Sequence, residues 1–216
     1  MNNTSFKKLS WVSLFGIAMA LLEAAVVVYL RQLYYPEGFE VPLKMLPRFI
    51  LMVELGRELA TIVMLLTVGI LTGKDFQERV CYFAYVFGIW DIFYYVWLKL
   101  LLDWPLSLLE WDILFLIPLP WVGPVAAPII VSLCLITGAV IILFLETKGK
   151  PVFITKGDWL ILVVAALIIV LSFLWDYSMV LNQHFPERYR WEIFLVGLGL
   201  GIGRFLWAIR KSAFKN

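Results

Sequence analysis

Seven ionisable side chains lie inside long apolar stretches of this sequence, where a membrane helix ordinarily carries none. They are Glu23, Glu54, Arg57, Glu58, Asp91, Asp176 and Arg204. Even on lenient insertion scales a charge at the centre of a bilayer costs about 3 kcal/mol, so such residues generally face a bundle interior and serve a function. Buried carboxylates bind cations, or hold protons and act as general acids. These are the two kinds of chemistry that we expect.

The stretch VELGRELATI is the most heavily charged of the apolar stretches. Glu54, Arg57, Glu58 and Thr61 occupy positions i, i+3, i+4 and i+7 of a predicted helix. This spacing places all four on one helix face, where Glu54 and Arg57 can form an ion pair. Glu54 and Glu58 repel one another unless a proton or a cation lies between them.

Aromatic residues accompany the acids. Tyr94 and Tyr95 follow Asp91 at i+3 and i+4, and their ring faces suit a cationic or flat ligand. We therefore expect one ligand-binding pocket, with Glu54, Glu58 and Asp91 as the acid–base candidates if the protein is an enzyme. Its predicted members are Glu23, Glu54, Arg57, Glu58, Asp91, Tyr94, Tyr95, Asp176 and Arg204. Five carboxylates against two arginines leave three acids that need protons or a bound cation.

The elements that position these residues are membrane helices. The chain has 216 residues, 62% of them hydrophobic and 16% charged, and its mean hydropathy is +0.90. A soluble domain this apolar would lack the polar surface it needs, so we predict an all-α, polytopic membrane bundle forming one domain over residues 1–216. About six spans are expected, at roughly 10–30, 49–71, 80–102, 125–145, 159–178 and 193–209.

The segment between the third and fourth spans, residues 103–125, is apolar but interrupted by prolines, which break helices. Its tryptophans suit the headgroup boundary of a membrane. We interpret it as an interfacial or re-entrant lid, although charge counting also permits a seventh span. These residues are Trp104, Pro105, Trp111, Pro118, Pro120, Trp121 and Pro124.

The distribution of basic residues predicts the orientation. On the six-span reading the side of the termini carries Lys7, Lys8, Lys74, Arg79, Lys148, Lys150, Lys156, Arg210, Lys211 and Lys215. The opposite side carries Arg31, Lys44, Arg48, Lys99, Arg188 and Arg190. Ten against six places both termini in the cytoplasm and, with the exception of Arg204, the charged cluster toward the outer leaflet. The predicted location is the cell membrane.

Small residues recur at helical spacing. Gly16, Ala20 and Ala24 form a small-xxx-small ridge in the first span, and Gly197 and Gly201 form another in the last. Such ridges allow close approach of a neighbouring helix, either within this chain or from a membrane-protein partner.

The sequence signals no cofactor. With His184 as the one histidine, bis-His haem ligation and a His-rich metal site are disfavoured. Cys81 and Cys134 are far apart and are interpreted as packing residues. A net charge of +2 without a dense basic cluster does not indicate a nucleic-acid partner.

Three functions remain open from the sequence. The first is binding or transport of a small solute, cation or proton through the pocket. The second is an intramembrane acid–base enzyme acting on a lipid or an isoprenoid, for example an isomerase or cyclase. The third is an accessory subunit of a larger membrane complex, in which the charges would be structural.

Overall fold

Seven helices and one β-hairpin make up the part of the chain that the computed structural model describes, which is residues 3–35, 47–182 and 184–213. Lys44 and Lys215 of the charge count lie outside these residues. The long helices confirm the all-α prediction, and each overlaps one of the six stretches in which a span is expected. They are α1 (Asn3–Tyr34), α2 (Arg48–Thr72), α3 (Phe76–Leu102), α4 (Ala126–Thr147), α5 (Lys156–Leu174) and α7 (Trp191–Ala213).

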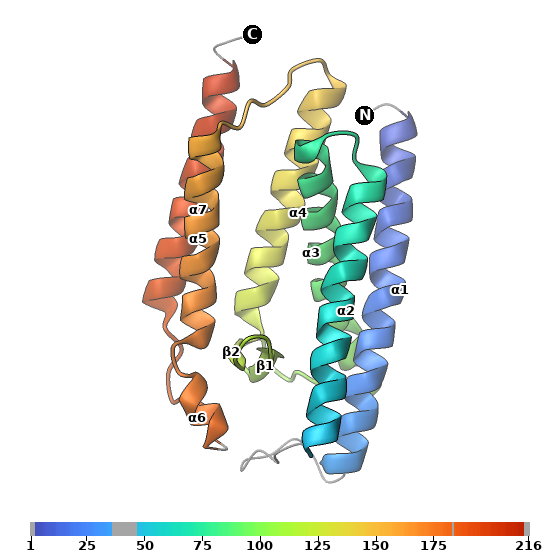
Figure 1. Cartoon of the computed structure of the whole chain (residues 1–216), viewed down its shortest axis with the longest axis vertical. Helices are drawn as coiled ribbons and strands as arrows, with labels where there is room; N and C mark the ends of the chain where they lie inside the picture. Colours follow the sequence, from blue (N-terminus) through green and yellow to red (C-terminus); the bar gives the residue numbers. More distant parts are fainter. Residues whose placement is uncertain (1–2, 36–46, 183, 214–216) are drawn as a thin grey trace.

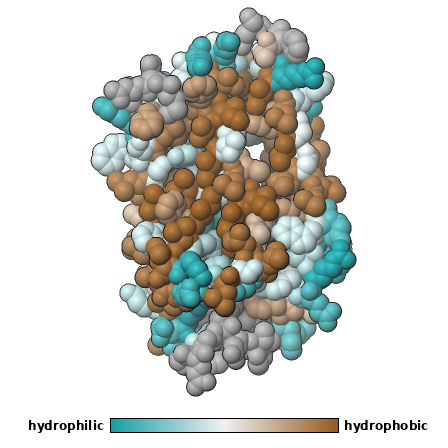
Figure 2. Space-filling view, turned by 180° about the vertical axis from the view of Figure 1, so that it is seen from behind, coloured by the Kyte–Doolittle hydropathy of each residue, from teal (hydrophilic) through white to brown (hydrophobic). Residues whose placement is uncertain are grey.

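Five helical stretches are long and apolar enough to cross a membrane. They are Ser5–Tyr34, Phe76–Leu102, Ala126–Thr147, Lys156–Leu181 and Trp191–Ala213. Helix α2 has 25 residues but is not among the five, and it carries Glu54, Arg57 and Glu58 in its first half. Figure 2 shows apolar residues over most of one face of the molecule, with hydrophilic residues concentrated toward its two ends. This distribution supports a membrane protein.

Helix α3 is the centre of the larger group of helices. It packs against α1, α2 and α4, whereas α5 and α7 pack mainly on each other (Figure 1). The start of α1 and the end of α7 lie at the same end of the molecule (Figure 1). The hairpin and the short helix α6 (Tyr177–Leu181) lie toward the opposite end.

Local sequence signals explain several helix boundaries. The Asp75 side chain accepts a hydrogen bond from the Glu78 backbone N–H and caps α3, and Thr155 and Asp158 form a capping box at the start of α5. The expected fifth span, 159–178, is not one continuous α-helix. Helix α5 ends at Leu174, and the chain turns before α6 begins at Tyr177.

The proline-rich segment contains an antiparallel hairpin of β1 (Trp111–Phe115) and β2 (Trp121–Pro124). No helix lies between Leu102 and Ala126, so within the described chain this segment is not a seventh helical span. The break in helical structure confirms the effect predicted for the prolines, whereas the strand pairing was not expected. In the register, Asp112 lies opposite Gly123 and Ile113 opposite Val122.

The hairpin tryptophans contact protein aromatic rings. Trp111 stacks on Phe185 at 6.2 Å between ring centroids, and Trp121 stacks on Phe173 of α5 at 6.1 Å. These contacts fasten the hairpin to the α5–α7 side of the molecule.

The small-residue ridges are used inside the chain. Ala20 and Ala24 are fully buried, and a Cβ added at Gly16 would lie 3.0 Å from Ile89 of α3. A Cβ at Gly197 would lie 2.8 Å from Ile169 of α5. The ridges predicted from small-residue spacing therefore join α1 to α3 and α7 to α5.

Candidate functional site

A cavity of about 200 Å³ lies among α1, α2, α3 and the hairpin. Seven of the nine predicted site residues line it: Glu23, Glu54, Arg57, Glu58, Asp91, Tyr94 and Tyr95. The lining is completed by Val27, Leu30, Arg31, Tyr34, Tyr35, Thr61, Trp90, Asp112, Ile113, Leu114, Phe115 and Leu116. The cavity exceeds the roughly 30 Å³ share of one water, and it is smaller than the ~300 Å³ or more of a drug-sized pocket.

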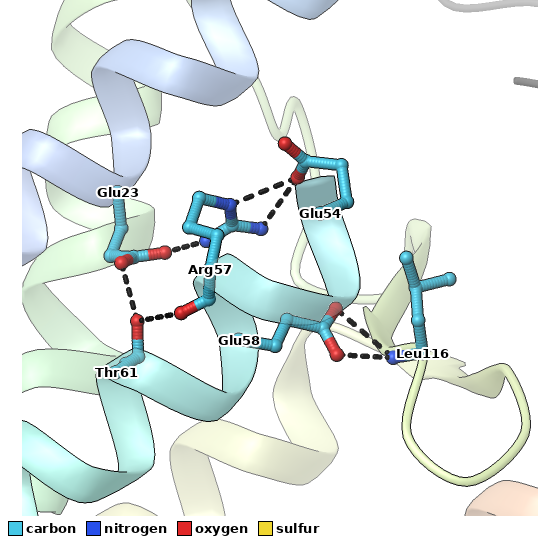
Figure 3. A network of polar contacts seen from close by, with 6 residues as sticks. All are labelled: Glu23, Glu54, Arg57, Glu58, Thr61 and Leu116. Atoms are coloured by element: carbon cyan, nitrogen blue, oxygen red, sulfur yellow. Dashed lines mark hydrogen bonds and ion pairs between the residues drawn. The ribbon is translucent and has the colours of Figure 1, made fainter. Parts of the chain in front are cut away.

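Arg57 is the centre of a network between α1 and α2 (Figure 3). Its guanidinium forms an ion pair with Glu23 of α1 and donates from Nε to Glu54 Oε2 at 2.9 Å. The Thr61 hydroxyl donates to Glu23 Oε1 at 2.5 Å. Because Glu23 and Glu54 are 6% and 5% exposed, Arg57 compensates two carboxylates that have lost most of their hydration.

Glu58 connects α2 to the hairpin segment. Both of its carboxylate oxygens accept from the Leu116 backbone N–H, at 3.0 and 2.9 Å (Figure 3). The donor is an uncharged main-chain group, so this contact positions the carboxylate without neutralising it.

Asp91 of α3 also has a neutral donor. The hydroxyl of Ser132, on α4, donates to Asp91 Oδ2 at 2.8 Å. This bond holds the carboxylate at the wall of the cavity and ties α3 to α4.

Asp112 and Arg31 belong to the site but were not predicted. Asp112 is 5% exposed, its Oδ2 accepts from the Tyr95 hydroxyl at 3.2 Å, and its Oδ1 lies 3.9 Å from the Arg31 guanidinium. That guanidinium lies 3.9 Å from the ring centroid of Trp104, which is cation–π distance. Strand alternation in WDILF was the available signal, because it turns Asp112 inward and away from Trp111.

Asp112 should make stability depend on pH. Burial raises the pKa of its carboxyl to about 6, against the opposing effects of Arg31 and the Tyr95 hydroxyl. The unfolded chain releases this proton at about pH 4, so between the two values the folded state binds more protons and stability falls as pH rises. From pH 4 to pH 7 we expect the wild type to lose about 2 kcal/mol relative to Asp112→Asn. Unfolding curves in detergent measure this difference, and parallel pH profiles would contradict it.

Two predicted members lie elsewhere. Asp176 lies between α5 and α6, where its Oδ2 accepts from Arg190 Nε at 3.2 Å. Arg204 of α7 pairs with the fully buried Asp158 of α5, at 2.5 Å between Nη2 and Oδ1. The structure therefore does not bring Asp176 and Arg204 to the cavity, because α5 and α7 pack on each other, apart from α1 and α2.

Aromatic rings form the α3 side of the cavity. Trp90 and Tyr94 are stacked with ring centroids 6.4 Å apart, and Tyr94 meets Tyr95 edge to face at 5.1 Å. Trp90 is 7% exposed, and among the described residues its indole Nε1 has no hydrogen-bond partner. The cavity thus combines carboxylates with stacked aromatic rings.

The charge balance of the lining is negative. Among the described lining residues, the carboxylates of Glu23, Glu54, Glu58, Asp91 and Asp112 outnumber the guanidiniums of Arg31 and Arg57 by three. Cys81 and Cys134 are free thiols, and no group of three or more His, Cys, Asp or Glu residues in the described chain is arranged to hold a metal ion. Comparison with known proteins gives no match to any family model, curated protein or solved structure.

Proposed function

We propose that this chain is an integral membrane protein that binds a small cationic solute or a proton in the cavity and carries it across the membrane. The observation that supports this most directly is the distribution of donors. Arg57 and Arg31 already lie beside Glu23, Glu54 and Asp112, whereas Glu58 and Asp91 receive neutral donors from Leu116 and Ser132. In a low dielectric such acids require a proton or an external cation.

The proposed topology has six spans, both termini in the cytoplasm and the cavity opening toward the outside. The described basic residues support it. Lys74 and Arg79 lie at the α2–α3 turn, and Lys148, Lys150 and Lys156 lie around the α4–α5 connection, at the same end as the termini (Figure 1). Positive residues favour the cytoplasmic side.

The test uses purified protein in liposomes that contain a pH-sensitive dye. Sodium, potassium, methylammonium and tyramine salts are added outside, and proton counterflow is followed by the dye signal. We expect at least one cation to change the dye signal. Glu58→Gln and Asp91→Asn should each reduce this signal about tenfold or more, because each removes the negative charge of a side chain while keeping its shape.

Glu192→Gln is the matched control, because Glu192 is an exposed residue in the first turn of α7, pairs with Arg188 and does not line the cavity. It should retain the wild-type response. The absence of a dye signal with every cation, or a signal that neither Glu58→Gln nor Asp91→Asn changes, would contradict the proposal. Turnover of a membrane lipid by the purified protein alone would instead favour the acid–base enzyme.

A further inference from the structure

The residues that line the cavity indicate more about its ligand than that the ligand is positively charged. Resting on the proposed function, we infer that its ligand is a small organic ammonium with a flat apolar body. Two independent features of the lining lead to this class: the acids whose hydrogen-bond donors are neutral, and the stacked rings beside them.

The first feature indicates the charged group of the ligand. Glu58 accepts from the Leu116 backbone N–H and Asp91 from the Ser132 hydroxyl, and a carboxylate with such neutral donors keeps further acceptor capacity. An ammonium has three donors and no acceptor, and it matches carboxylates whose other donors are neutral. A carboxylate ligand would meet an excess of like charge here.

The second feature fixes the body of the ligand. Trp90 directly precedes Asp91, and Tyr94 lies one helical turn after Trp90 with its ring stacked on the indole. Rings beside a carboxylate attract the positive end of a ligand and present an apolar surface to the rest of it. A bare inorganic ion would leave this aromatic surface unused.

Three small molecules test the charged group. Tyramine carries an ammonium on a flat ring, tyrosol replaces the ammonium by a hydroxyl, and para-hydroxyphenylpropionate replaces it by a carboxylate. Binding to the full chain in detergent is measured by calorimetry. We expect tyramine to bind about tenfold or more tightly than tyrosol or the propionate.

A substitution assigns the preference for an ammonium to its residue. Asp91→Asn should remove the preference for tyramine over tyrosol, and Glu192→Gln should leave it unchanged. Unaltered unfolding temperatures show that the variants are folded, and Asp91→Ser replaces Asp91→Asn if the latter fails this check.

The outcomes separate this inference from the proposed function. If sodium or methylammonium drives proton counterflow as well as tyramine does, the organic ligand class is wrong while cation transport stands. If tyrosol or the propionate binds as tightly as tyramine, the ammonium assignment is overturned.

Discussion

Replacing Arg57 with Met should destabilise the protein by about 3–5 kcal/mol, the cost typical of removing one partner from a buried ion pair. Arg57 is the described cation that contacts both Glu23 and Glu54, and it joins α1 to α2. Without it, two carboxylates stay buried with their charge uncompensated. Reversible unfolding in mixed micelles, followed by circular dichroism, measures the loss.

A triple variant separates charge from packing. Glu23→Gln and Glu54→Gln combined with Arg57→Met remove all three charges while keeping side chains of similar size. This protein should recover most of the lost stability, since uncharged groups of similar shape replace the buried ions at little net cost. A triple variant no more stable than Arg57→Met alone would show that packing, and not charge, is the function of Arg57.

The second large effect concerns the contact between α5 and α7. Gly197→Leu should prevent correct folding or cost about 3 kcal/mol or more. A Cβ at this position would lie 2.9 Å from the Ala165 carbonyl oxygen and 3.0 Å from the Ile169 backbone nitrogen. Backbone atoms of a helix cannot give way singly, so the two helices would have to separate. Yield of monodisperse protein and its unfolding temperature report the effect.

Gly199→Leu is the control on the same helix. No atom lies within 4 Å of a Cβ built at Gly199, and the residue is exposed. Its replacement should leave stability within about 1 kcal/mol or raise it slightly, because leucine is the better helix former. Equal losses at both positions would contradict the close packing of α7 on α5.

The helices were predictable from the sequence because each depends on a local property. An apolar run of about 20 residues forces internal backbone hydrogen bonding, and charges within it turn toward protein. The i, i+3, i+4, i+7 spacing placed Glu54, Arg57, Glu58 and Thr61 on one face, and the structure has all four lining the cavity. Proline positions correctly predicted the loss of helix after Leu102.

The remaining site residues depend on tertiary contacts. Arg31 lies near the end of α1, and Asp112 lies in the segment interpreted as an interfacial or re-entrant lid, so neither was predicted as an intramembrane charge. Their proximity results from the hairpin folding back against α1 and α3, which the spacing of residues did not indicate. The prediction that Arg204 lines the cavity was wrong for a similar reason. Its ion-pair partner Asp158 belongs to the capping box of α5, and the sequence did not indicate that the two residues meet.

The hydrogen bond from the Leu116 amide to Glu58 connects two parts of the molecule. The hairpin contacts α5 through Trp121 and α2 through the bond from Leu116 to Glu58, so it links the α5–α7 pair to the cavity wall. A ligand that recruits both Glu58 oxygens competes directly with that amide. Binding of such a ligand and the hydrogen bond between the hairpin segment and α2 are then thermodynamically coupled. A ligand that binds Glu58 weakens the hydrogen bond, and a stronger hydrogen bond lowers the affinity for the ligand.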